Sequence, residues 1–248
     1  MPVMGKLYVG TSGWIYKDWD EIFYPKDLSS KNKLKYFSQH FKTAEVNYSF
    51  YRLPSPSTYE NWYNQTPEDF IFAVKPSRFI THIKRLKGVK NSWKTFLKNA
   101  LYLKEKLGPF LFQFPSNFKF NSENVRRLEE VMEYISSPKL SFAFEFRHQS
   151  WCNDDAYGIL KIYRGAWVIS DSSRYPKAEI ITANFVYIRM HGPGSLFSSK
   201  YTSEELKILA QKIKGWLKEG LDVYTYFNND FKGYAVQNAE ELLGLLVG

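Results

Sequence analysis

The chain has 248 residues, enough to bury a sizeable core, and this length is ordinary for a single α/β barrel, so we expect one domain spanning 1–248. A single cysteine excludes an internal disulfide framework, and the lack of a signal-peptide pattern or a long apolar run predicts a cytoplasmic protein with no membrane partner. The net charge of +9 is local, because residues 75–106 hold ten Lys or Arg and one acidic residue.

Eight short β-type runs recur along the chain. They cover residues 6–12, 43–50, 70–75, 109–114, 141–147, 166–171, 184–191 and 222–228. Apolar residues at helical spacing lie between most of these runs, and 236–246 forms a last helix. Strands that alternate with helices are typical of parallel sheets with right-handed crossovers, and eight such units predict a closed, TIM-barrel-like (β/α)8 barrel. The stretch RYPKAEIITA, between the sixth and seventh runs, is too short and proline-broken for a full helix, so the sixth helix should be degenerate.

The basic segment 75–106 admits two interpretations. Charge runs of this kind are usually a solvated helix face, but clustered lysines also attract polyanions by releasing counterions. Trp93 and Phe96 are interleaved with these lysines at helical spacing, so we expect them in the core rather than as a platform for stacking bases.

In the fifth run, FAFEFR, the two-residue period of a strand separates the phenylalanines from Ala143, Glu145 and Arg147. The aromatic face should lie under the helices, which directs the polar face into the barrel. The same alternation places polar side chains near the carboxyl ends of several strands, where barrels of this type build their sites. The expected ring consists of Glu45, Asn47, Lys75, Gln113, Glu145, Arg147, Asp171, Arg189, His191 and one of Asn228, Asn229 or Asp230.

Buried charges without partners cost several kcal/mol each, so the ring must pair internally, bind a ligand or line a wet cavity. An internal network that only plugs the barrel is one alternative. The other is a site in which Arg147, Arg189 and Lys75 clamp a phosphate or carboxylate. Glu45 and Glu145 are then candidates for general acid or base, and His191 for a proton shuttle.

Lys75 as a Schiff-base nucleophile would require a depressed pKa, which a sequence does not reveal. No glycine-rich phosphate loop is present, so no nucleotide cofactor is indicated.

His82, His148 and His191 follow the third, fifth and seventh runs, so a divalent-metal site with Glu145 or Asp171 is conceivable. However, the spacing matches no recognised metal motif and the neighbouring arginines oppose cation binding.

The first loop, GTSGWIYKDW, carries Trp14, Tyr16 and Trp19. These aromatic side chains form either a wall for a sugar or nucleobase or a hydrophobic lid on the barrel rim. The last run ends in YFNNDFKGYA, whose amide and acid groups, Asn228 among them, are suited to hydroxyls or a phosphate.

Seven motifs in order resemble one known family. They are GTSGWIYKDW with FYP at 23–25, EVNYSFYRLP, FAVKPSRFITH, LGPFLFQFP, FEFRHQSW, RMHG and YFNNDFKGYAVQNA. Together they are similar to the YecE-like family, domain of unknown function 72, across essentially the whole chain. The resemblance implies a TIM-barrel-like fold and a polar pocket at positions that match Glu45, Asn47, Lys75, His82, Gln113, Glu145, Arg147, His191 and Asn228. It supplies no reaction, and Tyr48 and Ser49 depart from the small residue and threonine expected before FYR.

These observations predict an enzyme that acts by acid and base chemistry on a phosphorylated or otherwise anionic small molecule. A rival from another class is a nucleic-acid-binding barrel or nuclease in which residues 75–106, including Lys84, Arg85, Lys87 and Lys90, track the backbone. A third alternative is a binding protein without catalysis.

Overall fold

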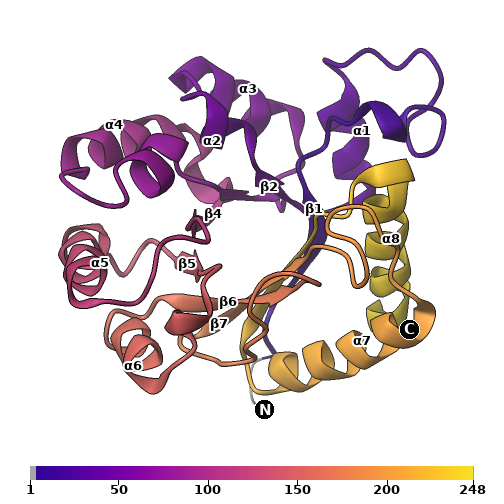
Figure 1. The fold of residues 1–248 in the computed structure, drawn as a ribbon. Helices are drawn as coiled ribbons and strands as arrows, with labels where there is room; N and C mark the ends of the chain where they lie inside the picture. The colour runs from indigo at the N-terminus through magenta and orange to yellow at the C-terminus, as the bar shows by residue number, and fades with distance from the viewer. Residues whose placement is uncertain (1–3, 248) are drawn as a thin grey trace.

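A computed structural model describes residues 4–247, in which eight parallel strands pair in chain order and β1 closes onto β8. The strands are β1 Leu7–Ser12, β2 Thr43–Val46, β3 Ile71–Val74, β4 Leu107–Gln113, β5 Phe142–Glu145, β6 Ala166–Asp171, β7 Phe185–Met190 and β8 Asp222–Phe227. The helices form an outer ring around this barrel (Figure 1). The predicted barrel fold is therefore confirmed.

The α-helices are α1 Lys33–His40, α2 Tyr48–Tyr51, α3 Pro56–Gln65, α4 Lys90–Ala100, α5 Ser122–Ile135, α6 Asp154–Ile162, α7 Ser203–Lys218 and α8 Tyr234–Val247. Short helical turns are η1 Lys17–Trp19, η2 Phe79–Ile83, η3 Leu101–Lys106, η4 Gln149–Trp151 and η5 Phe231–Gly233.

The connection from β6 to β7, residues 172–184, contains no helix, as the sequence predicted. Side-chain hydrogen bonds hold this loop against the base of the barrel. The Thr182 hydroxyl donates to the Gly165 carbonyl (2.6 Å) and accepts from the Trp167 amide (2.7 Å). The Trp167 indole also donates to the Ala178 carbonyl (3.1 Å). The loop thus replaces a helix as the cover of β6.

The two faces of the strands separate as their alternation predicts. The phenylalanines of β4 and β5 pack under the helices in the main core, where Phe112 and Phe144 stack with ring centroids 5.5 Å apart. Smaller residues such as Ala73, Leu111 and Ala143 fill the barrel interior. This arrangement turns Gln113 and Glu145, the next inward positions on β4 and β5, toward the carboxyl ends of the strands.

One predicted strand is wrong over half its length. The run 43–50 was expected to be extended throughout, but β2 ends at Val46 and α2 begins at Tyr48. The Ser49 hydroxyl, which is fully buried, donates to the carbonyls of Val46 (3.1 Å) and Lys75 (2.6 Å) and so favours a helical turn across the top of β2 and β3. Asn47 consequently lies at the start of this turn.

Helices α3 and α6 begin at residues whose side chains cap them. Helix α3 follows a Ser55 cap that accepts from the Thr58 amide (3.2 Å), with Pro56 in its first turn. Helix α6 follows an Asn153 cap that accepts from the Ala156 amide (2.9 Å).

The basic segment lies along η2, α4 and η3. Trp93 and Phe96 are buried in the main core, which confirms the sequence-based expectation. Lys106 is buried as well, and its Nζ donates to the carbonyls of Tyr63 (2.6 Å) and Thr66 (2.7 Å). At least one of the ten basic residues is therefore part of the packing rather than of a solvated face.

Candidate functional site

The mouth of the barrel contains a cavity of about 640 Å³. It is lined by Tyr16, Asn47, Phe50, Tyr51, Lys75, Arg78, His82, Gln113, Arg147, Arg189, Phe197, Asn228 and Asp230. Four of these side chains are basic and one is acidic, so the wall has an excess of positive groups. Such a cavity favours an anion.

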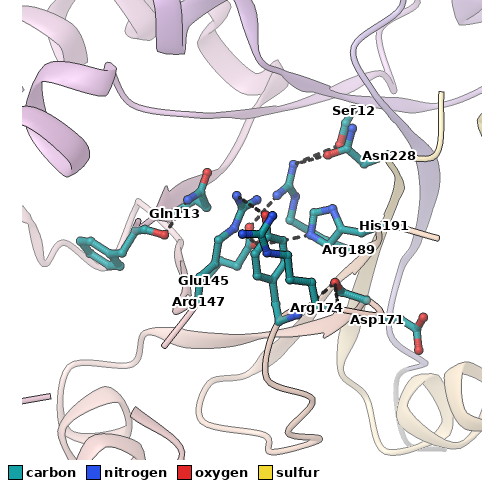
Figure 2. Close-up of polar contacts among 12 residues, drawn as sticks. Ser12, Gln113, Glu145, Arg147, Asp171, Arg174, Arg189, His191 and Asn228 are labelled. Carbon is teal, nitrogen blue, oxygen red and sulfur yellow. Dashed lines mark hydrogen bonds and ion pairs between the residues drawn. The ribbon is translucent and has the colours of Figure 1, made fainter. Parts of the chain in front are cut away.

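Beneath the cavity, Arg189 on β7 joins two buried carboxylates. Its Nε and Nη2 donate to the two oxygens of Glu45 (3.0 and 2.7 Å), and its Nη1 donates to Glu145 Oε2 (2.5 Å). Nη2 also approaches the oxygens of Ser12 (3.3 Å) and Asn228 (3.2 Å). Figure 2 shows Arg147, Arg189 and His191 converging on Glu145. Every nitrogen of the Arg189 guanidinium is engaged, which fixes its orientation.

These contacts decide the ionisation of both carboxylates. Burial by itself would raise the pKa of Glu45, but the Arg189 guanidinium outweighs burial and holds this pKa below its usual range. Burial likewise opposes ionisation of Glu145, and the positive charges of Arg147 and Arg189 hold its pKa well below the usual range. Neither carboxylate lines the cavity. Their geometry favours a role in orienting arginines over the general acid or base role expected from the sequence.

His191 lies behind Glu145 and is fully buried. Burial lowers the pKa of its imidazole, although the nearby Glu145 carboxylate acts in the opposite direction. Its Nε2 lies 3.2 Å from Glu145 Oε1, and its Nδ1 has no partner among residues 4–247. A neutral ring that donates from Nε2 fits these contacts. The side chain does not line the cavity, which gives a proton shuttle no direct path to a ligand there.

Arg147 follows β5 and reaches the cavity from the other side. Its Nε donates to Glu145 Oε1 (3.0 Å), its Nη1 donates to the Tyr175 hydroxyl (3.1 Å), and its guanidinium lies over the Tyr175 ring, 4.1 Å from the centroid. No hydrogen bond from Nη2 to residues 4–247 is present. Arg78, at the exposed rim, likewise has no carboxylate partner in that range. These free donors are the groups that an incoming anion would meet.

Lys75 directly follows β3 and is only 8% exposed. Burial, together with Arg189 and Arg147, lowers the pKa of its amine to about 7, against the opposing effect of Glu145 and Glu45. Its Nζ lies over the Phe50 ring, 4.1 Å from the centroid. Within residues 4–247 this amine has neither a hydrogen-bond acceptor nor an ion-pair partner. A neutral amine therefore faces the cavity over part of the physiological pH range.

His82 and Gln113 form the wall beside Lys75. Burial and the Lys75 charge lower the pKa of His82 to about 4, which keeps the ring neutral. Its Nδ1 lies 2.9 Å from the Thr81 hydroxyl and its Nε2 lies 3.4 Å from Gln113 Nε2. The Gln113 amide also donates to the Phe114 carbonyl (2.6 Å). Both side chains thus present uncharged polar atoms to a ligand.

Asp230, one of three alternatives that the sequence left open at the end of β8, is the acidic group in the cavity wall. Burial raises the pKa of its carboxyl to about 7, although the Asn228 amide donates to its Oδ2 (3.0 Å). Its Oδ1 is buried and has no partner among residues 4–247. The cavity therefore contains a carboxyl group that remains protonated for part of the time near neutral pH.

A second cavity, of about 540 Å³, adjoins the first and shares Tyr16, Asn47 and Tyr51 with it. Its remaining walls are mainly aromatic: Trp14 and Trp62 meet edge to face with centroids 5.4 Å apart, and Tyr48 and Tyr51 stand exposed at the rim. Asn47 Oδ1, between the two cavities, is buried without a partner among residues 4–247.

The prediction that Asp171 belongs to the polar ring is wrong. On β6 the inward position is Ser170, which is buried, whereas Asp171 points away from the cluster (Figure 2). Its carboxylate accepts from the Tyr201 hydroxyl (2.9 Å) and from Lys177 Nζ (3.1 Å) outside the barrel. Ala166 and Val168 point into the barrel, so the period of two places Ser170 inward and Asp171 outward.

The histidines considered as metal ligands do not come together. His148 Nδ1 lies 2.8 Å from the Ser150 hydroxyl in the turn after β5. Among residues 4–247 no three His, Cys, Asp or Glu side chains are grouped as metal ligands would be. In the same range, no helix combines the length and apolar character needed to cross a bilayer.

Comparison with known sequences places these features in context. A profile of the family described as protein of unknown function DUF72 matches residues 8–248. The UPF0759 protein YunF of Bacillus subtilis is 28% identical over an alignment of 272 residues, gaps included, that covers 97% of this chain and 94% of YunF. The UPF0759 protein YecE of Escherichia coli K12 is 25% identical over 144 residues, 57% of this chain and 48% of YecE.

Solved structures agree with the fold. A DUF72 family protein from Thermotoga maritima matches with a TM-score of 0.88 and 32% identity, covering 98% of this chain and 100% of that protein. A DUF72 family protein from Enterococcus faecalis matches with a TM-score of 0.81 and 21% identity over 99% of both chains, a similarity of fold alone.

Proposed function

The chain belongs to the DUF72 family, and because that family's description assigns no activity, we propose from the cavity itself that the protein is an enzyme that binds a small anionic substrate and acts on it by acid and base chemistry. The proposal rests on Lys75, whose buried amine has no partner among residues 4–247. Burial of such an amine would only cost free energy in a barrel filled by an internal network, whereas in a binding site the amine would contact an anionic ligand.

The anionic group of the substrate, a phosphate or a carboxylate, binds between Arg147, Arg78 and Lys75. The two buried carboxylates are balanced by Arg147 and Arg189, so Arg78 adds positive charge that is not neutralised within residues 4–247. Arginine suits this role because its planar fork donates in parallel to two oxygens. An anion bound here would also raise the pKa of Lys75, which couples binding to proton uptake.

The acid and base roles fall to Lys75 and Asp230. Both have a pKa near 7, and both line the cavity. General acid–base catalysis works best when the pKa of the group lies near the working pH. Glu45 and Glu145, which the sequence favoured for these roles, instead hold the two arginines in place.

The uncharged part of the substrate is expected in the aromatic cavity. A planar or sugar-like group there would contact Trp14, Trp62 and Tyr51, with the Asn47 side chain at the junction of the two cavities. Because Tyr16, Asn47 and Tyr51 belong to both cavities, one molecule is able to occupy both.

Binding of anions should be measured by thermal shift, with phosphate, sugar phosphates, nucleotides and single-stranded DNA at low and moderate salt. A ligand at 100 times its Kd stabilises a protein by about 2.7 kcal/mol, or roughly 5–10 °C in Tm at this chain length. We expect a small phosphate compound to give such a shift at both salt concentrations. The Arg147→Ala variant should lose it, and Arg126→Ala, an exposed site on α5, should keep it.

Nucleic-acid binding through the basic segment predicts a different result. Exposed lysines such as Lys84, Lys87 and Lys90 would then bind DNA in a steeply salt-dependent manner. A shift seen with DNA alone, at low salt and equally in Arg147→Ala, would contradict the anion cavity and identify the basic segment as the functional surface.

A further inference from the structure

We infer that Lys75 is a nucleophile that forms a covalent imine with the carbonyl carbon of an aldehyde or ketone bearing a phosphate or carboxylate group. This inference rests on the proposed function, since the anion clamp is what would bring the carbonyl to the amine. It narrows the substrate class from anions in general to anionic carbonyl compounds.

The inference rests on a difference between Lys75 and two other buried lysines in the partners of their amine nitrogens. Lys33 Nζ is paired with the Asp20 carboxylate, and Lys106 Nζ donates to two backbone carbonyls and a hydroxyl of the α3 region. Both amines therefore have hydrogen-bond acceptors or an ion-pair partner. Lys75 is also buried, yet among residues 4–247 its Nζ has neither kind of partner and lies over the face of Phe50. An amine in this setting has a lone pair available to attack a ligand.

The surrounding charges explain why Lys75 stays free of a partner. The nearest carboxylates, Glu45 and Glu145, are committed to Arg189 and Arg147 by bidentate and paired contacts of 2.5 to 3.0 Å. Burial and the same arginines lower the pKa of the amine to about 7, so a large fraction is unprotonated at neutral pH. The face of Phe50 favours the charged form and so acts against this effect, but it offers the amine no hydrogen-bond acceptor.

The reaction balances without a further reagent. The Lys75 nitrogen forms a bond to the carbonyl carbon, and one of the two amine protons passes to the carbonyl oxygen to give a neutral carbinolamine. That oxygen then takes a second proton from an acid and leaves as water while the carbon–nitrogen double bond forms, which leaves a cationic imine with one proton on nitrogen. Asp230 is placed to supply this proton because its side chain lines the same cavity. The cationic imine then withdraws electrons from the neighbouring carbon, which eases loss of a proton or cleavage of a carbon–carbon bond there.

Trapping by borohydride tests this directly. The full chain is incubated at pH 7 with glyoxylate or with dihydroxyacetone phosphate, reduced with sodium borohydride, and mapped by peptide mass spectrometry. We expect one stable adduct per chain, on Lys75, that is suppressed by inorganic phosphate in excess. The Lys94→Met variant, at an exposed position of α4, should keep the adduct, Arg147→Ala should reduce it at least tenfold, and Lys75→Met should abolish it.

The outcomes separate this inference from the proposed function. An absent adduct, or adducts spread over exposed lysines and retained by Lys75→Met, would overturn the imine. If phosphate still raised the Tm of the wild type but not that of Arg147→Ala, the proposal of anion binding would stand and only the imine would be rejected. The wild-type phosphate competition keeps the test valid even if a variant folds poorly.

Discussion

Replacing Arg189 with methionine should lower the free energy of unfolding by about 3 to 5 kcal/mol at neutral pH, because the change leaves two buried carboxylates without their shared cation. The wild-type guanidinium contacts Glu45 and Glu145 with all three nitrogens. Urea unfolding followed by tryptophan fluorescence would measure the loss. Arg189→Lys should rescue little of it, since an ammonium is unable to supply the same planar set of donors.

The pH dependence of this loss follows from the two carboxylates. In the wild type their pKa values lie below the usual 4.5, so their contribution to stability is complete above that pH and is lost only as the pH falls through the lowered values. Without Arg189, burial should raise the pKa of Glu45 above its usual value, and that of Glu145 less, because Arg147 still pairs with Glu145. The stability deficit of Arg189→Met should therefore narrow as the pH falls through these raised pKa values, and further as it falls through the lowered values of the wild type. A loss under about 1 kcal/mol at pH 7 would contradict the strong coupling that the contacts indicate.

Replacing Lys75 with methionine should have the opposite effect and stabilise the folded protein at pH 7 by about 4 kcal/mol, because the pKa of the amine falls from 10.5 to about 7 and each unit corresponds to about 1.36 kcal/mol. The folded pKa of about 7 lies below the ordinary 10.5, so between these values the unfolded chain binds the extra proton. Wild-type stability should therefore rise as the pH increases from 7 toward 10.5. The methionine variant lacks this slope, and the difference between the two proteins should vanish at the alkaline end.

Urea unfolding at several pH values between 6 and 10 would measure this difference, with Lys94→Met as the matched control. The control removes a lysine from an exposed position of α4 and should change stability by less than about 0.5 kcal/mol. If Lys75→Met were instead destabilising at pH 7, the amine would be a structural cation, and both its role as a base and its role as a nucleophile would fail.

The barrel was predictable because its signals are local and repeated. Alternating aromatic and small residues in FIFAVK, PFLFQF and SFAFEFR place both faces of the strands, and the broken stretch 174–183 predicts the missing helix. Strand ends were less predictable. Residues 47–50 alternate as a strand would, but Ser49 bonds to backbone carbonyls on β2 and β3 and turns the chain into α2.

The composition of the site was partly predictable and its division of labour was not. The two-residue period of a strand predicts that Glu45, Glu145 and Arg189 point into the barrel mouth. It does not predict how deep each side chain lies, and depth distinguishes the carboxylates that hold arginines from the groups that line the cavity. Asp230 follows β8, where the strand period no longer applies, so the sequence left it among three alternatives. The protonation state of Lys75 depends on whether the nearby carboxylates are already paired with arginines. That pairing exists only in the folded protein, so the sequence does not reveal it.

The most direct test is the pH dependence of Lys75 acylation, measured by competitive labelling with trace acetic anhydride and peptide mass spectrometry. We expect labelling of Lys75 to be half-maximal near pH 7, well below the ordinary lysine value of 10.5, and to move to higher pH when phosphate is added. That result would establish a neutral, accessible amine coupled to an anion site. A midpoint near the ordinary lysine value, with no response to phosphate, would contradict the assignment of this cavity as an active site.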